Sequence, residues 1–179
     1  MNKKVKILLI AAGVVITPVL LSPLPGFKAP LSTVVEANDG SLLGARIADD
    51  GQWRFPGSGQ VPEKFEKSLL TFEDRYYYWH PGINPVSIVR AFASNIKAGK
   101  IVSGGSTITM QVARMSGGNK PRTYGEKFIE MLSALTLELF CSNKKIIELY
   151  TANATFAGNT VEREAAPWRY TGKSHPALT

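Results

Sequence analysis

The stretch that decides the fold reads EDRYYYWHPG and occupies residues 73–82. It combines an acidic pair with four consecutive aromatic residues, a histidine and a Pro-Gly turn. Just before it, Phe65, Leu69 and Phe72 recur at the spacing of one helical face. This pattern predicts a short helix that delivers Glu73 at its C-terminal end, at a junction between helix and loop and not in the middle of a core.

Helical patterns continue along the chain from residue 84. Asn84 and Pro85 form a favourable N-cap and first-turn pair, and Gly99 ends the pattern. The apolar stripe of this helix comprises Val86, Val89, Phe92, Ala93 and Ile96. A later helix from about Glu126 to Phe140 carries a second stripe, comprising Phe128, Met131, Leu132, Leu135 and Leu139. Residues 61–179 are therefore predicted to form a mainly α domain.

The first 22 residues, 1–22, are predicted to be a membrane anchor. Lys3, Lys4 and Lys6 precede an uninterrupted apolar run over residues 7–16, which continues through a proline to Leu21. A basic flank that leads into an apolar segment is typical of membrane targeting. The run is shorter than the roughly 20 apolar residues of a full span, so a cleaved signal peptide stays open. We favour an uncleaved single-pass anchor because residues 22–26, SPLPG, contain no convincing small-x-small cleavage site.

Residues 23–60 are predicted to be a proline-rich linker followed by a small β-hairpin segment. Residues 34–37 and 42–47 read as two strands around an Asn-Asp-Gly turn at residues 38–40. A second hairpin turn, Asp-Asp-Gly, follows at residues 49–51. At 179 residues, the whole chain has room for one enzymatic domain, which we assign to residues 61–179.

The charge balance favours partners that carry phosphate. Lys and Arg number 21 against 14 Asp and Glu, a formal net charge of +7. Such a surplus suits nucleic acid, an anionic membrane surface or a phosphorylated substrate. Nucleic acid is disfavoured because the basic residues are scattered and no zinc-finger, helix-turn-helix or RNA-binding signature is present. The single cysteine, Cys141, excludes an internal disulfide and a cysteine metal cluster.

A second motif follows the first by some twenty residues: residues 104–111 read GGSTITMQ, with Ser106 placed to cap the next helix. By their order and spacing, the two stretches resemble the first two signature motifs of the peptidoglycan glycosyltransferases of family 51. Residues 127–130, KFIE, are similar to the third motif, Lys-x-x-Glu. Residues 53–56, WRFP, and 168–174, WRYTGKS, resemble the bifunctional class A penicillin-binding proteins of the 1C type. The resemblance implies a lysozyme-like glycosyltransferase lobe.

The resemblance assigns two carboxylates to the reaction that joins lipid II units and releases undecaprenyl pyrophosphate. Glu73 matches the general base that deprotonates the 4-hydroxyl of the acceptor sugar. We expect it in a partly apolar, aromatic-rich cleft. Glu130 matches the second carboxylate, which positions the donor, its leaving group or a divalent cation, Mg²⁺ or Mn²⁺. No protein metal cluster is otherwise predicted.

The resemblance also assigns cations and helix-end donors to the pyrophosphate of the donor. Arg114 and Arg122 match positions where the family has cations that hold this group, and their fork geometry suits phosphate. Lys127 shares a helix face with the second carboxylate, since the two are three residues apart. The remaining predicted substrate-binding residues are Gln111, Ser106 and Thr107, of which the last two lie at a helix N-terminus, where backbone N–H groups favour anions.

The chain departs from the family pattern at several positions. Glu126 stands where most members have arginine, and Met110 stands where many have glutamine. Ala152 replaces an asparagine of the fourth motif, and the chain stops soon after His175, before the last helices of the family's lobe. We therefore expect a C-terminally truncated glycosyltransferase domain without a transpeptidase domain. The Ser-x-x-Lys matches at residues 94–97 and 142–145 have no partner motifs, so penicillin binding is not predicted.

Three other interpretations stay open. An inactive remnant of a bifunctional penicillin-binding protein predicts exposed apolar side chains on a helix from Ile146 to Phe156. A glycan-cleaving enzyme also uses a Glu in a helical lobe, but the cation set has no evident role in hydrolysis. A basic nucleic-acid-binding module requires a contiguous basic surface. Our leading prediction is an enzyme of the bacterial inner membrane, with its catalytic part on the periplasmic side and with lipid II, the growing glycan strand and other cell wall synthesis proteins as partners.

Overall fold

The computed structural model describes residues 2, 5, 6, 13, 17, 19, 26–39, 41–55, 61–118, 120, 121, 123–157, 160 and 161 of the chain. These residues are mainly helical, as predicted, with two small two-stranded antiparallel sheets. The chain divides into two compact units, Met1–Gly26 with Leu69–Ile146 and Phe27–Ser68 with Ile147–Thr179. The boundaries predicted after residues 22 and 60 stay predictions.

The first unit is built around helix α4 (Ile108–Ser116). Its neighbour α5 (Tyr124–Phe140) packs against it. The unit also contains α3 (Pro85–Ala98), the 3-10 turn η1 (Tyr77–Trp79), residues 69–73 of α2 (Glu63–Glu73) and residues 143–146 of α6 (Asn143–Asn153). Ile108, Met110 and Val112 have no exposed surface, and Leu137 of α5 is 1% exposed. Thr109 and Ala113 of α4 are buried as well, so more than half of this helix lies in the core of the unit.

Local capping signals define the helix ends. The side chain of Asn84 accepts a hydrogen bond from Ser87 N at 3.0 Å, and Pro85 is the first residue of α3. Gly99 ends this helix with φ 63°, the left-handed conformation that suits glycine. These predictions are confirmed. The predicted cap of α4 is wrong by one residue, because the Thr107 hydroxyl and not Ser106 accepts the hydrogen bond from Met110 N.

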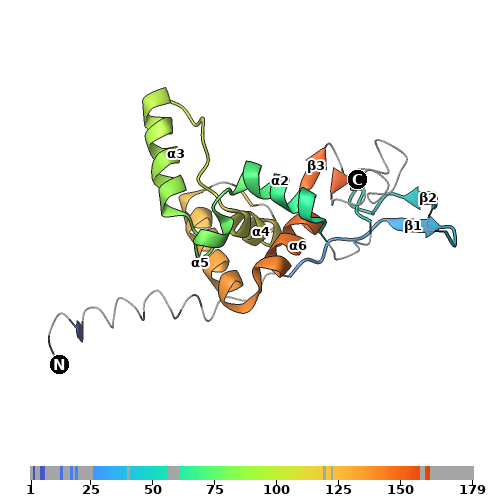
Figure 1. Cartoon of the computed structure of the whole chain (residues 1–179), viewed down its shortest axis with the longest axis horizontal. Helices are drawn as coiled ribbons and strands as arrows, with labels where there is room; N and C mark the ends of the chain where they lie inside the picture. The colour runs from blue at the N-terminus through green and yellow to red at the C-terminus, as the bar shows by residue number, and fades with distance from the viewer. Residues whose placement is uncertain are drawn as a thin grey trace. The chain divides into compact units, whose positions relative to one another are not determined.

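Helix α3 stands out from the α4 and α5 pair, and the chain returns to α4 in an extended segment (Figure 1). Only Ala91 of this helix is buried. The predicted apolar stripe is present but faces away from the core: Val86, Val89, Phe92 and Ile96 are 65–76% exposed. The stripe predicted for α5 is likewise only partly covered, since Phe128 and Leu139 are 61% and 64% exposed.

The second unit contains both small sheets. Strands β1 (Thr33–Glu36) and β2 (Leu42–Arg46) pair antiparallel with a bulge between Val35 and Glu36, which confirms the predicted hairpin. Ser32 N donates to Arg54 O at 2.8 Å, and Val161 N donates to Trp53 O at 2.9 Å. Strands β3 (Thr155–Ala157) and β4 (Thr160–Val161) also pair antiparallel, and this later hairpin was not predicted.

The prediction that the helix beginning near residue 146 reaches Phe156 is wrong at its C-terminal end. Helix α6 (Asn143–Asn153) ends three residues earlier, and Phe156 lies in β3. Asn153 Nδ2 bonds Leu149 O at 2.8 Å in the last turn, and the chain then turns into the strand.

Most of the predicted membrane anchor lies outside the described residues. Of its apolar run, Val19 is described, and its carbonyl accepts a hydrogen bond from the Thr136 hydroxyl of α5 at 2.8 Å. This valine is 4% exposed. None of the helices in the described parts of the chain has the length and apolar character needed to cross a membrane.

Candidate active site

Glu73 and Gln111 form the first contact of the site. Glu73 is the last residue of α2, and its Oε2 accepts a hydrogen bond from Gln111 Nε2 of α4 at 3.0 Å. Glu73 is exposed, and so are Phe72 before it and Trp79 later in the same motif, at 90% and 87%. The expected enclosure of Glu73 by aromatic rings is therefore wrong. An amide donor on a core helix, and not a closed cleft, orients this carboxylate.

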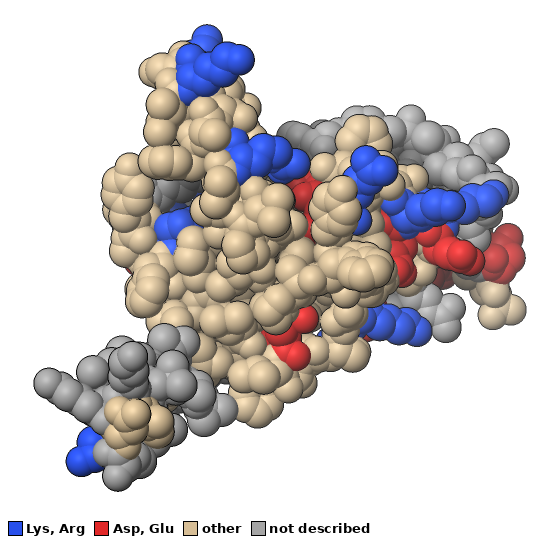
Figure 2. Space-filling model, turned by 60° about the vertical axis from the view of Figure 1, so that its left-hand side comes forward, with Lys and Arg blue, Asp and Glu red and all other residues tan. Residues whose placement is uncertain are grey.

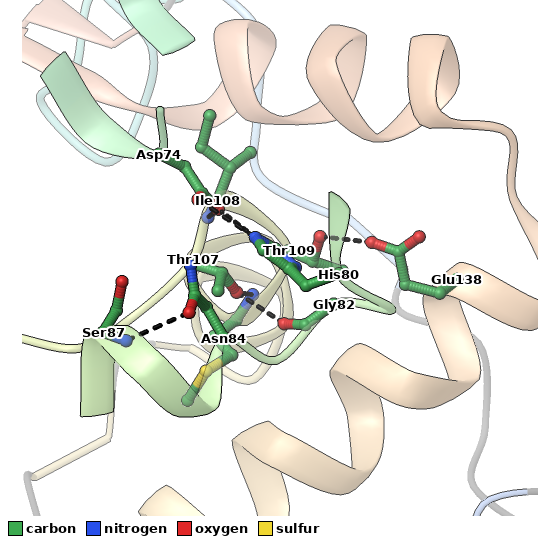
Figure 3. A network of polar contacts seen from close by, with 10 residues as sticks. Asp74, His80, Gly82, Asn84, Ser87, Thr107, Ile108, Thr109 and Glu138 are labelled. Carbon is green, nitrogen blue, oxygen red and sulfur yellow. Dashed lines mark hydrogen bonds and ion pairs between the residues drawn. The ribbon is translucent and has the colours of Figure 1, made fainter. Parts of the chain in front are cut away.

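The residue after Glu73 ties the loop to the start of α4 (Figure 3). Asp74 is 7% exposed, and its carboxylate accepts from Ile108 N at 3.1 Å and lies 3.0 Å from His80 Nε2. His80 is also buried, with 6% of its side chain exposed. A buried carboxylate with two donors is held in one orientation. His80 therefore helps to hold the shape of this loop through a specific partner, Asp74.

Two threonines continue this network into α4 and α5 (Figure 3). Thr107 Oγ1 donates to Gly82 O at 2.6 Å while it caps α4, and it is 1% exposed. Thr109 Oγ1 donates to Glu138 Oε1 at 2.6 Å. Burial raises the pKa of the Glu138 carboxyl above its ordinary value, and the Thr109 hydrogen bond opposes this shift. The network fixes the 73–82 loop against both helices.

The second carboxylate, Glu130, lies between two cations. Lys127 Nζ contacts Glu130 Oε2 at 2.7 Å and Ser106 Oγ at 2.6 Å. Arg114 Nε lies 3.8 Å from Glu130 Oε1, which is an ion pair too long for a hydrogen bond. Arg114 Nε is buried and has no hydrogen-bond partner among the described residues. The Arg114 side chain as a whole is 29% exposed, so the outer part of its guanidinium, and not the buried Nε, is open to a ligand.

These residues line one pocket of about 570 Å³ in the first unit. Its polar side includes Ser106, Arg114, Lys127 and Glu130, and its apolar side is lined mainly by α3 and the segment that follows it. A pocket with a few convergent polar groups on an apolar wall is the usual form of a ligand site. The two cations favour an anionic group at its polar end.

The structure places the residues predicted from sequence in two groups, the pair of Glu73 and Gln111 and the pocket residues Ser106, Arg114, Lys127 and Glu130. Helix α4 carries Gln111 and Arg114 one turn apart, so the partners of both carboxylates belong to one rigid element. Thr107 has its hydroxyl occupied inside the protein, and its predicted contact with a substrate stays a prediction. Arg122 lies outside the described residues.

The donor set near Glu130 does not fit a divalent cation. Such ions take about six or more oxygen ligands, commonly from several carboxylates or carbonyls. Glu130 faces Lys127 and Arg114, and no group of three His, Cys, Asp or Glu side chains that could hold a metal occurs among the described residues. We therefore assign no step to a metal ion.

Sequence reasoning missed roles for Asp74, Glu138 and Asn95. Asp74 lies within the first motif, but only its distant partner Ile108 N reveals that it is a fold-positioning residue. Glu138 is a single acidic residue near the end of an apolar helix, a signal that could have marked it. Asn95 gave no signal in the sequence, because its partners lie in an irregular segment.

Comparison with known proteins decides the family. A family model described as Transglycosylase matches residues 41–179, more than half of the chain. The chain belongs to the transglycosylase family. It is 42% identical over 161 residues to penicillin-binding protein 1C of Escherichia coli (strain K12), which covers 89% of this chain and 21% of the relative. The family predicted from the sequence motifs is confirmed.

Other relatives agree with this membership. The chain is 40% identical over 114 residues to penicillin-binding protein 1A of Aquifex aeolicus (strain VF5), covering 64% of this chain and 16% of the relative. It is 32% identical over 141 residues to penicillin-binding protein 4 of Bacillus subtilis (strain 168), covering 79% of this chain and 23% of the relative. The chain thus spans about a fifth of the length of these relatives.

Proposed function

We propose that this transglycosylase-family chain is a membrane-associated peptidoglycan glycosyltransferase that polymerises lipid II into glycan strands. One observation supports the proposal most strongly. Helix α4 holds Glu73 through Gln111 at 3.0 Å and Glu130 through Arg114 at 3.8 Å. Two carboxylates with different surroundings, one exposed and one flanked by cations, suit two different tasks on one substrate pair.

Glu73 acts as the general base. Its carboxylate accepts the proton of the acceptor 4-hydroxyl while that oxygen forms a bond to C1 of the donor sugar. The bond between C1 and the pyrophosphate oxygen breaks at the same time, and the leaving group departs with the electron pair. Gln111 donates to Glu73 Oε2, which leaves Oε1 and the remaining lone pairs for the incoming hydroxyl.

The pocket around Glu130 receives the departing pyrophosphate. Lys127 and the exposed part of the Arg114 guanidinium supply positive charge and N–H donors where negative charge develops. Glu130 holds both cations in place, and it is only 14% exposed at its side chain. The donor-binding residues of this proposal also include Ser106, which contacts Lys127. Arg122 is included on sequence grounds alone.

The exposed face of α3 supports contact with the cytoplasmic membrane. Val86, Val89, Phe92 and Ile96 recur on one face and are 65–76% exposed, and Ile101 after the helix is 88% exposed. Large exposed apolar patches mark interaction or membrane sites. Figure 2 shows basic side chains at the far end of this helix, where the sequence has Lys97 and Lys100. Apolar and basic side chains together suit an anionic lipid surface, on the periplasmic side in this proposal.

The remnant interpretation finds less support. It predicts exposed apolar side chains on the helix near residue 146, whereas Ile146 and Ile147 are 0% and 1% exposed. Tyr150 on the same helix is 7% exposed. A fold that covers these side chains is compatible with an active enzyme.

The test is lipid II polymerisation by the purified chain in detergent, with Glu73→Gln as the variant and Glu63→Gln as its control. Glu63 lies in the first turn of the same helix, so its change alters net charge equally without touching the site. We expect glycan product from the wild type and the control, and a loss of at least about a hundredfold in the variant. A folded wild type that forms no product would refute the proposal, and cleavage of preformed glycan would favour hydrolysis.

A further inference from the structure

The extended segment between α3 and α4, residues 100–107, forms one wall of the pocket. Ile101 and residues 103–106 of this segment all line it, opposite residues of α4 and α5. Within the described part of the chain, no backbone-to-backbone hydrogen bond fastens residues 100–106. An extended stretch without such bonds depends on side chains for its position.

One side chain of α3 supplies that support. Asn95 Oδ1 accepts hydrogen bonds from Val102 N at 2.8 Å and Ser103 N at 2.9 Å. Asn95 Nδ2 donates to Ser103 O at 3.0 Å. A carboxamide is suited to this arrangement because one end accepts two N–H groups while the other donates. Three backbone groups of the pocket wall are therefore satisfied by a single residue.

Two further contacts hold the segment at its other end. A Cβ atom added at Gly105 would lie 2.8 Å from Ile88 Cα, so the backbone here packs directly on α3. Ser106 Oγ contacts Lys127 Nζ of α5 at 2.6 Å. The wall is thus attached to Asn95 at Val102 and Ser103 and to Ile88 and Lys127 at Gly105 and Ser106, with Gly104 between the two attachments.

We propose that Asn95 is a positioning residue that fastens this pocket wall and thereby sets where Ser106 and Lys127 meet the donor. Asn95 also lines the pocket. The role proposed for it is indirect: it acts through the segment that it holds and touches no reacting atom. The functional half of the inference rests on the proposed glycosyltransferase activity. The structural half rests on the three hydrogen bonds alone.

Three variants test the inference. Asn95→Ala removes all three hydrogen bonds, whereas Asn95→Asp keeps an acceptor for both N–H groups and loses the donor to Ser103 O. Ser94→Ala is the matched control, because it removes a polar group from the adjacent, partly exposed position of the same helix turn. Each is measured by amide hydrogen exchange at Val102 and Ser103 and by steady-state polymerisation of lipid II.

We expect Asn95→Ala to exchange these two amides at least about tenfold faster than the wild type, since each lost hydrogen bond weakens protection by roughly that factor. Asn95→Asp retains most of the protection, and Ser94→Ala retains all of it. In polymerisation, Asn95→Ala raises the KM for lipid II several-fold more than it lowers kcat, and Asn95→Asp restores part of the affinity.

The two measurements separate this inference from the proposed function. Unchanged exchange of Val102 and Ser103 in Asn95→Ala would overturn the fastening itself. Faster exchange with wild-type KM and kcat would overturn the positioning role while the proposed function stood. A wild-type chain without glycan product would refute the proposed function, and the exchange rates would still decide whether Asn95 holds the wall.

Discussion

Asp74 offers the sharpest test of how the site is held. The carboxylate is 7% exposed, accepts from Ile108 N at 3.1 Å and contacts His80 Nε2 at 3.0 Å. Asp74→Ala leaves both donors buried without a partner, and each such orphaned group costs about 1–3 kcal/mol. His80 Nδ1 is already buried without a partner among the described residues, so the ring cannot compensate through that atom. We expect a loss of roughly 3–5 kcal/mol in the free energy of unfolding.

The assay is urea unfolding followed by circular dichroism, with lipid II polymerisation measured on the same preparations. Asp74→Asn keeps one acceptor oxygen but presents an amide to the other donor, so a loss of about 1.5–3 kcal/mol is expected. The exposed Asp49→Asn is the control and changes the free energy of unfolding by at most about 0.5 kcal/mol. An Asp74→Ala protein within 1 kcal/mol of the wild type would refute the claim that this carboxylate pins the loop to α4.

Two further predictions concern the contact between the first motif and α5. Gly82→Ala forces a side chain onto a backbone with φ 76° and places its Cβ 2.7 Å from Glu138 Cγ and 3.0 Å from Ala134 O. Urea unfolding should therefore show a loss of about 2–4 kcal/mol in the free energy of unfolding. Gly104→Ala has open space at its Cβ and should change this free energy little, and equal effects of the two variants would contradict the geometry. Burial raises the pKa of the Glu138 carboxyl, so the folded protein retains that proton to higher pH than the unfolded chain. The contribution of Glu138 to the free energy of unfolding is therefore present at low pH and decreases as pH rises through the raised pKa. In urea titrations between about pH 4 and pH 8, the free energy of unfolding of the wild type should fall relative to that of Glu138→Gln as pH rises. Parallel curves for the two proteins would contradict the prediction.

Local signals allowed part of the fold to be predicted. Asn84, Pro85 and Gly99 define the ends of α3 through their own backbone preferences, which is why these ends were predicted correctly. The cap of α4 was misassigned because Thr107 is selected by a hydrogen bond to Gly82 O, 25 residues away. Nothing in the local sequence of either residue encodes that contact.

Periodicity predicted which side of α3 is apolar but not what covers it. Val86 and Phe92 lie on the predicted face, yet they are 76% and 66% exposed. A hydrophobic stripe favours burial against any apolar surface. Which surface covers it depends on the tertiary structure, and local periodicity does not contain that information. The site residues of the three motifs were predicted by resemblance, and the structure adds how Gln111 and Arg114 link the two carboxylates.

The central claim is that Glu73 performs the proton transfer while the pocket around Glu130 binds the donor. The most direct measurement is single-turnover formation of the first glycosidic bond by wild type and Glu73→Gln, with lipid II binding measured in parallel. The account predicts that Glu73→Gln binds lipid II within about twofold of the wild type and forms the bond at least about a hundredfold more slowly. Bond formation by Glu73→Gln at the wild-type rate would contradict it.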